Sequence, residues 1–152
     1  MHIRPYSSRD RDSVRDILRL SQTFTPEEVS VALEVLDEAA GSPQSGDYTV
    51  YCAETEEGTV AGYICYGPIP MTDRCYDLYW ICVDRERKKA GVGTSLILAM
   101  ESDLKTRGAR HVYIDTSSTP PYDDARFFYE RHGYRTVSVS PDFYRVGDDK
   151  IV

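Results

Sequence analysis

The sequence predicts an α/β fold of the α+β kind, with about four helices on the faces of one mixed sheet of about seven strands. Short segments rich in aromatic and β-branched residues alternate with amphipathic segments, which is the pattern of strands and helices. Glycine and proline interrupt these segments, for example at Gly41-Ser42-Pro43 and Gly133. These observations indicate helices packed on a sheet, with no linker or internal repeat.

Composition narrows the class of protein. The chain has 152 residues, of which 41% are hydrophobic and 28% charged, so we expect a single globular domain over residues 1–152. The apolar runs are too short for a membrane span, and the polar start predicts no signal peptide. A net charge of −7 argues against a nucleic-acid partner and leaves room for a cationic one.

The four cysteines lie too far apart for a paired metal motif. They are Cys52, Cys65, Cys75 and Cys82, each within a predicted strand. Because free cysteine packs as a small apolar residue, we expect buried thiols. This pattern predicts no metal and a reducing, cytoplasmic location.

The first half of the chain contains two predicted helices and three predicted strands. The second helix has the clearest start, because Thr25 at the N-cap and Glu28 form a capping box around Pro26. The expected elements are, in order, a strand at His2–Tyr6, a helix from Ser8 or Asp10 to about Ser21, a helix from Pro26 to Gly41, and strands at Tyr48–Ala53 and Thr59–Tyr66, joined by a turn at Glu56-Glu57-Gly58.

A basic turn with two glycines joins the next strand, Tyr76–Val83, to a helix that ends at Gly108. The turn contains Gly91-Val92-Gly93 and the cations Arg85, Arg87, Lys88 and Lys89. A helix N-terminus offers unpaired N–H groups and a positive dipole end, and glycine lets a ligand approach the backbone. The turn is therefore a candidate phosphate site, although a lone G-x-G after a strand is more often only a tight turn.

The sequence of the last third of the chain predicts further strands and one helix. The expected elements are a strand at His111–Asp115, a polar loop at Thr116–Pro121, a helix at Asp123–His132 capped by Gly133, a strand at Tyr134–Ser140, and an edge strand in the tail to Val152.

Two stretches resemble the signatures of the GNAT acetyltransferase superfamily. Lys88–Gly93 is similar to its Gln/Arg-x-x-Gly-x-Gly/Ala turn, with Lys in the first position. Phe127–Tyr134, with Ala125 ahead of it, is similar to its Ala-x-x-Phe-Tyr…Gly-Tyr motif. The resemblance implies a GNAT-like acyl-CoA N-acyltransferase fold. It also implies direct transfer of acetyl from acetyl-CoA to a primary amine (a small molecule, an amino acid or a peptide), with no covalent enzyme intermediate.

The resemblance also assigns candidate coenzyme residues. The turn would bind the pyrophosphate through its main chain, the end of the preceding strand would pair with the pantetheine arm, and the second motif would contribute from its helix. The residues in these places are Lys88, Lys89, Ala90, Gly91, Val92, Gly93 and Thr94; Ile81, Cys82 and Val83; and Ala125 and Phe128. Many relatives have Asn where this chain has Tyr122, so Ser117 or Thr119 is expected to supply the missing hydrogen bond.

Two residues are candidates for catalysis. Tyr129 occupies the position of the family tyrosine that meets the coenzyme sulfur, and its phenol would protonate the leaving thiolate. The pattern of the amphipathic helix alone would instead indicate a residue that packs in the core. Asp77 is the candidate base, acting directly or through water, because lysine-like amines are protonated at neutral pH. With no bulge, alternation places Asp77 on one face with Tyr79, Ile81 and Val83. The alternative is an edge carboxylate with no role.

The sequence does not identify the acceptor of the acetyl group. Aromatic residues and carboxylates at Gln22–Thr25, Tyr76–Tyr79 and Pro141–Asp149 favour a cationic amine, whereas Arg74 and Arg145 favour an acceptor with a carboxylate. Acidic residues that only maintain solubility are an equal alternative. The expected partners are acetyl-CoA and the amine, with a homodimer as one possible assembly. An inactive acyl-CoA-binding or interaction module of the same fold is the other function considered.

Overall fold

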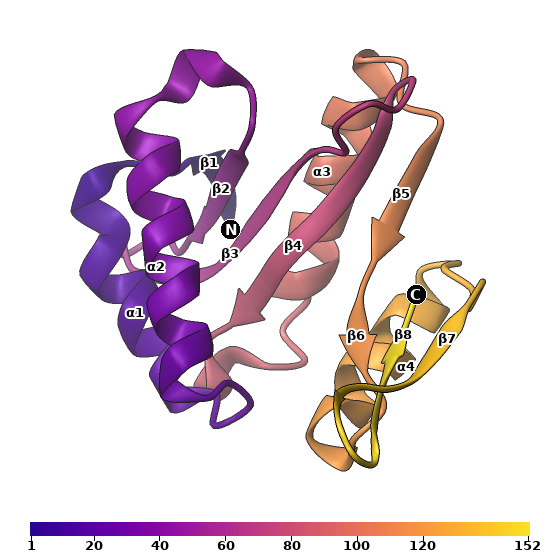
Figure 1. The fold of residues 1–152 in the computed structure, drawn as a ribbon. Helices are drawn as coiled ribbons and strands as arrows, with labels where there is room; N and C mark the ends of the chain where they lie inside the picture. The colour runs from indigo at the N-terminus through magenta and orange to yellow at the C-terminus, as the bar shows by residue number, and fades with distance from the viewer. The chain divides into compact units, whose positions relative to one another are not determined.

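A computed structural model describes residues 1–152, apart from the side chain of Gln44. The chain divides into two units, Met1–Val112 and Tyr113–Val152. Figure 1 shows the described elements, and each unit is built around its own sheet. The α+β class is confirmed, but eight strands in two sheets replace the single sheet that the sequence predicts.

The first unit contains a five-stranded sheet in the order β1-β2-β3-β4-β5, whose last strand crosses the boundary between the units. Strands β1 to β4 are paired antiparallel. The elements are β1 (His2–Pro5), α1 (Arg11–Leu20), α2 (Pro26–Gly41), β2 (Thr49–Glu54), β3 (Val60–Pro68), β4 (Cys75–Val83), α3 (Val92–Thr106) and β5 (His111–Ile114), with short 3₁₀ helices at Ser8–Asp10, Pro43–Ser45 and Arg85–Arg87.

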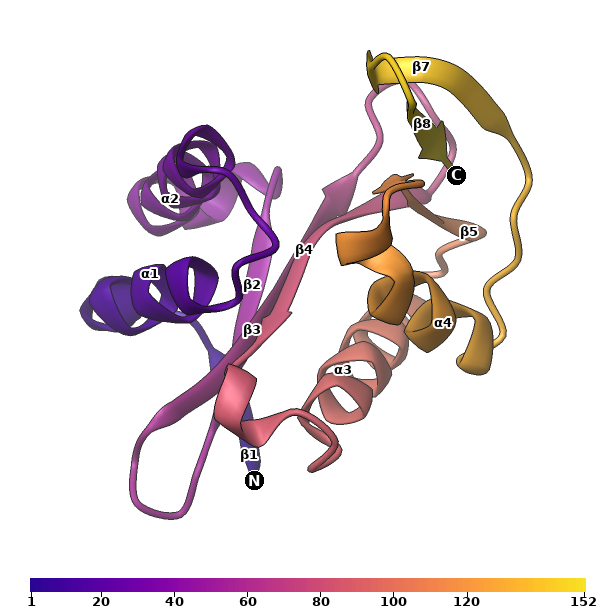
Figure 2. The ribbon, with the colours of Figure 1, turned by 90° about the horizontal axis from the view of Figure 1, so that it is seen from below.

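The helices of this unit cover both faces of its sheet. Figure 2 shows α1 and α2 on one side of β2 to β4 and α3 on the other. On the α3 side, a Cβ at Gly62 would lie 3.2 Å from Val92 and 3.3 Å from Leu96, so β3 and α3 pack closely here. Tyr66 on β3 donates its hydroxyl to Asp103 on α3 at 2.5 Å. These contacts fix the helix that follows the basic turn.

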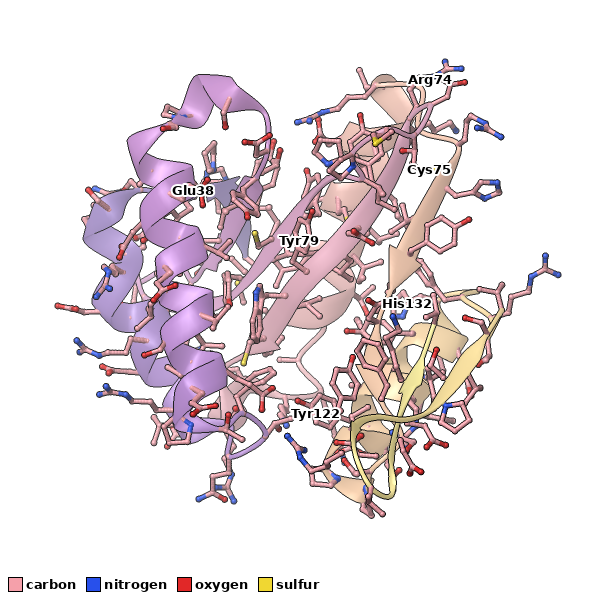
Figure 3. The ribbon with its side chains drawn as sticks, viewed as in Figure 1. Glu38, Arg74, Cys75, Tyr79, Tyr122 and His132 are labelled. Carbon is pink, nitrogen blue, oxygen red and sulfur yellow. The ribbon has the colours of Figure 1, made fainter. Side chains whose placement is uncertain are left out.

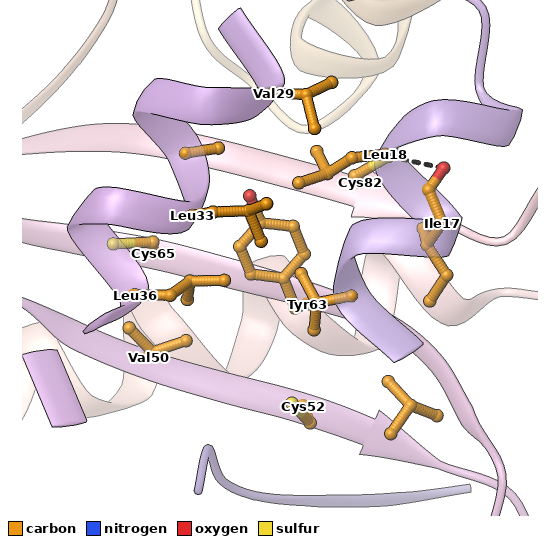
Figure 4. Close-up of a cluster of buried hydrophobic side chains, with 13 residues drawn as sticks. Ile17, Leu18, Val29, Leu33, Leu36, Val50, Cys52, Tyr63, Cys65 and Cys82 are labelled. Carbon is orange, nitrogen blue, oxygen red and sulfur yellow. Dashed lines mark hydrogen bonds between the residues drawn. The ribbon is translucent and has the colours of Figure 1, made fainter. Parts of the chain in front are cut away.

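The core between the sheet and α1–α2 is the cluster drawn in Figure 4. It combines apolar side chains of both helices with Cys52, Tyr63, Cys65 and Cys82 from three adjacent strands. All four cysteines are buried and free, as the sequence predicts. Burial raises the pKa of Cys52 and Cys65 to about 12 and that of Cys82 to about 11. Each fully buried Leu, Ile or Val contributes about 1.5–3 kcal/mol to folding.

The start of α2 confirms the capping box predicted from sequence. The Glu28 N–H donates to Thr25 Oγ1 at 3.1 Å, and the Thr25 N–H donates to the Glu28 carboxylate at 3.2 Å. Pro26 occupies the first helical position, where its missing N–H is not needed. The start of α2 is thus encoded by local residues.

A buried ion pair ties β1 to the start of α1. Arg4 donates to both carboxylate oxygens of Asp10 at 2.9 Å and to Glu54 at 2.7 Å. Asp10 is only 4% exposed, and the Ser7 N–H also donates to it at 2.9 Å. The bonds from Arg4 lower the pKa of Asp10 below its usual value. An unpaired charge here would be costly because Asp10 is almost fully buried.

We expect this pair to make folding sensitive to acid. Because the folded state lowers the pKa of Asp10, its contribution is complete above the unfolded value of about 3.9 and is lost as the pH falls below it. Urea unfolding at several pH values should show that Asp10→Asn is less stable than the wild type at pH 6. The free energy of unfolding of the variant should also fall less steeply as the pH is lowered. Asp37→Asn is the control, because Asp37 has an arginine partner too, Arg11, but its side chain is 52% exposed. Identical acid profiles for wild type and Asp10→Asn would contradict the expectation.

The second unit contains a three-stranded antiparallel sheet in the order β6-β8-β7 and one helix. Its elements are β6 (Thr116–Ser117), a 3₁₀ helix (Pro120–Tyr122), α4 (Asp123–Arg131), β7 (Val139–Arg145) and β8 (Asp148–Ile151). The sequence pattern predicts a loop at Thr116 and a strand from Tyr134. The structure instead pairs Thr116–Ser117 with β8 and starts β7 at Val139. Two-residue strands are set by distant partners, so local patterns miss them.

Candidate active site

The basic turn of the first unit has the backbone geometry of an anion site. Gly91 adopts φ 81° as the N-cap of α3, and Lys89 adopts φ 71° two residues earlier. The first helical bond runs from the Ser95 N–H to the Gly91 carbonyl at 3.0 Å. The N–H groups of the first turn therefore have no acceptor within the helix and stand at the positive end of its dipole.

The turn also presents positive side chains to solvent. Arg85, Lys88 and Lys89 are exposed, whereas Arg87 is half-buried and lies 3.9 Å from Asp84. Among the described residues, neither Lys88 nor Lys89 forms an ion pair. No Cβ contact would arise at Gly91 within 4 Å, so its backbone is open to a ligand. This donor set fits a diphosphate, because main-chain N–H groups and ammonium groups both bind phosphate oxygens.

The end of β4 lies directly before this turn. Ile81 and Val83 pair with Ile64 and Gly62 of β3, on the face that α3 covers. Cys82 points to the opposite face, where it is 7% exposed and its thiol contacts the Ile17 carbonyl at 3.9 Å. The side chains of the three predicted pantetheine residues thus point to opposite faces of β4. What the three residues can offer together to a ligand is their main chain.

A bulge in β4 changes the predicted position of Asp77. Cys65 pairs with Trp80 and Tyr66 pairs with Leu78, which leaves Tyr79 as the extra residue. Because a bulge shifts the alternation, Asp77 lies on the α1–α2 face with its partner Gly67, and not with Ile81 and Val83. The shared face was expected only for a strand without a bulge, and the structure does not meet that condition. Asp77 is half-buried and stays a candidate base.

The candidate acid lies on α4 of the second unit. Ala125, Phe128 and Tyr129 are half-buried on this helix, as the sequence pattern predicts. The Tyr129 ring packs against Phe128 at 5.7 Å and Tyr134 at 6.4 Å between ring centroids. His132 is the C-cap residue of α4, and its Nδ1 lies 2.8 Å from the Phe128 carbonyl.

A buried hydrogen-bond network holds Ser117. Its hydroxyl donates to Asp148 at 2.5 Å and lies 2.7 Å from the Thr119 hydroxyl. Asp148 is 3% exposed and also accepts from Arg145 at 2.9 Å, while Arg126 of α4 donates to the Ser117 carbonyl at 2.5 Å. Sequence reasoning missed Asp148, because its partner is 31 residues away and no local pattern marks it. The network joins β6, β8 and α4.

The two arginines that could hold an acceptor carboxylate are both paired with aspartate. Arg74 binds Asp73 at 3.0 Å, and Arg145 binds Asp148. This pairing weakens the case for a carboxylate-bearing acceptor. Among the described residues, no group of three or more His, Cys, Asp or Glu is arranged to hold a metal ion, and no helix has the length and apolarity to cross a membrane.

Comparison with known proteins agrees with this geometry. The family model described as the acetyltransferase (GNAT) family matches residues 12–134. An uncharacterized N-acetyltransferase from Methanocaldococcus jannaschii is 29% identical, over 100% of this chain and 89% of its own length. A GNAT-family acetyltransferase from Desulfovibrio desulfuricans is 39% identical, with a TM-score of 0.93 over 99% of this chain and 94% of that one.

A more distant structure supports the fold alone. An aminoglycoside 6'-N-acetyltransferase complexed with coenzyme A is 20% identical, with a TM-score of 0.73 over 99% of this chain and 94% of that chain. The family model includes both the basic turn and the helix of Tyr129. The chain therefore belongs to the GNAT acetyltransferase family.

Proposed function

We propose that this acetyltransferase moves the acetyl group of acetyl-CoA to a primary amine by direct attack within a ternary complex. The observation that carries the proposal is the turn at the start of α3, where open main-chain donors and unpaired lysines fit a diphosphate. When bound, acetyl-CoA supplies an activated thioester. The family membership and the coenzyme-bound structure of the same fold support this coenzyme.

In this proposal, the residues from Lys88 to Thr94 bind the pyrophosphate. The main chain of Ile81–Val83 pairs with the pantetheine arm and orients the thioester carbonyl, whose developing charge an N–H group stabilises. The amine nitrogen forms a bond to the carbonyl carbon as the carbon–sulfur bond breaks. Asp77, directly or through water, accepts the proton from nitrogen, and Tyr129 donates a proton to the leaving sulfur. Ser117, Ala125 and Phe128 are the further residues proposed to support this arm.

Substitution of Gly91 by alanine tests the coenzyme site. The expected result is an acetyl-CoA Kd at least about tenfold weaker, because the new Cβ enters the open space at the turn, and a stability loss of about 1–2 kcal/mol from the left-handed backbone. Gly58→Ala is the matched control: Gly58 has φ 83°, also has nothing within 4 Å, and lies in the β2–β3 hairpin. Calorimetry and thermal melts would show equal stability losses and a binding loss only in Gly91→Ala. Equal affinity of the two variants for acetyl-CoA would contradict a coenzyme site at the turn of Gly91.

A panel of amines, with release of the coenzyme thiol as readout, tests catalysis itself. Transfer to any primary amine supports the enzyme. Binding of acetyl-CoA without transfer would instead favour a non-catalytic module of the same fold. The observation favouring that alternative is that the Ser117 hydroxyl is held by Asp148, while Tyr122 occupies the position of the family Asn.

A further inference from the structure

Tyr48 and Tyr79 form an aromatic pair on the sheet face that α1 and α2 cover. Their ring centroids are 5.5 Å apart with an interplanar angle of 66°. Tyr79 is the extra residue of the β4 bulge, and its ring lies over Gly67, where a Cβ would come within 3.1 Å of Tyr79 Cε2. Tyr79 remains 39% exposed, although it belongs to a strand that is otherwise largely buried. The bulge therefore presents an aromatic ring to solvent on β4, the strand whose end is proposed to pair with the pantetheine arm.

The surroundings of the pair are negative. Asp47 precedes Tyr48, Asp77 lies two residues before Tyr79, and Glu38 lies on α2 (Figure 3). Among the described residues, Glu38 and Asp47 form no ion pair with Lys or Arg, whereas Asp37 of the same helix binds Arg11 at 2.7 Å. Aromatic faces and carboxylates together attract ammonium groups.

The hydroxyl groups of Tyr48 and Tyr79 stay uncharged at neutral pH in these surroundings. Burial and Glu38 raise the pKa of Tyr48, and burial and Asp77 raise the pKa of Tyr79. Each phenol therefore keeps its proton at neutral pH, and its oxygen can accept a hydrogen bond from an ammonium group.

We propose that Tyr48 and Tyr79 bind a second cationic group of the acceptor, so that the preferred acceptor is a diamine. The bound ammonium cannot be the nucleophile, because the attacking nitrogen must lose its proton. Tyr79 precedes Ile81 on the same strand by about 7 Å, since a strand rises about 3.3 Å per residue. This separation matches the length of a short diaminoalkane. The inference rests on the proposed N-acetyltransfer and names its acceptor class.

Three acceptors that differ in one group test the inference. They are 1,4-diaminobutane, butylamine and 4-aminobutanoate, each assayed with acetyl-CoA by thiol release. The expected result is a kcat/KM for the diamine at least about tenfold above that for butylamine, and lowest for the carboxylate. Tyr79→Leu should raise KM for the diamine about tenfold and leave KM for butylamine and the Kd of acetyl-CoA unchanged.

A matched variant and a binding measurement complete the test. Tyr51→Leu removes a ring from the Tyr51–Tyr66 stack on the opposite face of the same sheet, and should leave both KM values unchanged. Tetramethylammonium, which cannot be acetylated, should shift the NMR signals of Tyr48 and Tyr79 in the wild type.

Four outcomes would overturn the inference. Equal kcat/KM for diamine and butylamine, or an unchanged diamine KM in Tyr79→Leu, would do so while acetyltransfer stands. Absence of acetyl-CoA binding would remove the proposed function and the acceptor with it. Absence of the tetramethylammonium shift would exclude the ammonium site whatever the activity.

Discussion

Gly67→Ala should lower the free energy of unfolding by about 3 kcal/mol, equivalent to a Tm about 10 °C lower. A Cβ at Gly67 would overlap the main-chain oxygen of Asp47 and approach Tyr79 Cε2 to 3.1 Å. Because the first obstacle is backbone, no side-chain rotation can relieve it, and the segment before β2 must move. Thermal and urea unfolding would measure the loss.

Gly41→Ala provides the matched control for this variant. Gly41 is the last residue of α2, its φ is not in the left-handed region, and nothing lies within 4 Å of the position that a methyl group would take there. Alanine at this position should leave stability unchanged or slightly raised, because it reduces the entropy of the unfolded chain. Similar melting curves for wild type and Gly67→Ala would show that the Asp47 main chain can move aside at little cost.

Tyr129→Phe should lower kcat by about 100-fold if the phenol protonates the leaving sulfur. The ring contacts with Phe128 and Tyr134 survive this substitution, so folding and the Kd of acetyl-CoA should change little. The loss should therefore appear in kcat and not in KM, as expected for a contribution made in the transition state. Steady-state kinetics and calorimetry with acetyl-CoA would separate the two.

Tyr134→Phe is the control for loss of a hydroxyl in the same aromatic group. Its kcat should match that of the wild type, because Tyr134 lies beyond the end of α4 and has no proposed chemical role. An undiminished kcat in Tyr129→Phe would remove Tyr129 from the acid role and leave it as a packing residue of α4.

Features encoded by neighbouring residues could be predicted from the sequence. The capping box at Thr25 and Glu28, the turn at Gly91 and the amphipathic helix α3 depend on contacts within a few residues, and all three are present. The buried cysteines also followed from local strand patterns. The family signatures are local as well, which is why the amino-acid order alone is enough to single out the basic turn.

Features set by distant partners could not be predicted. The bulge at Tyr79 arises from the register of β3 against β4, and no residue type in β4 marks it. The division into two sheets depends on β6, whose two residues form a strand only because β8 pairs with them. The buried Asp148 likewise depends on Ser117 far earlier in the chain. In each case the missing information is which segments pair.

The buried thiols have a practical consequence for measuring turnover. Thiolate is the species that attacks chromogenic disulfide reagents, and burial raises the pKa of Cys52, Cys65 and Cys82 well above neutral pH. The fourth cysteine, Cys75, is protected by burial, with 8% of the residue exposed. The native chain should therefore consume such a reagent slowly, and the colour formed in an assay should count coenzyme molecules released. A rapid colour change from enzyme alone would report denatured protein in the sample.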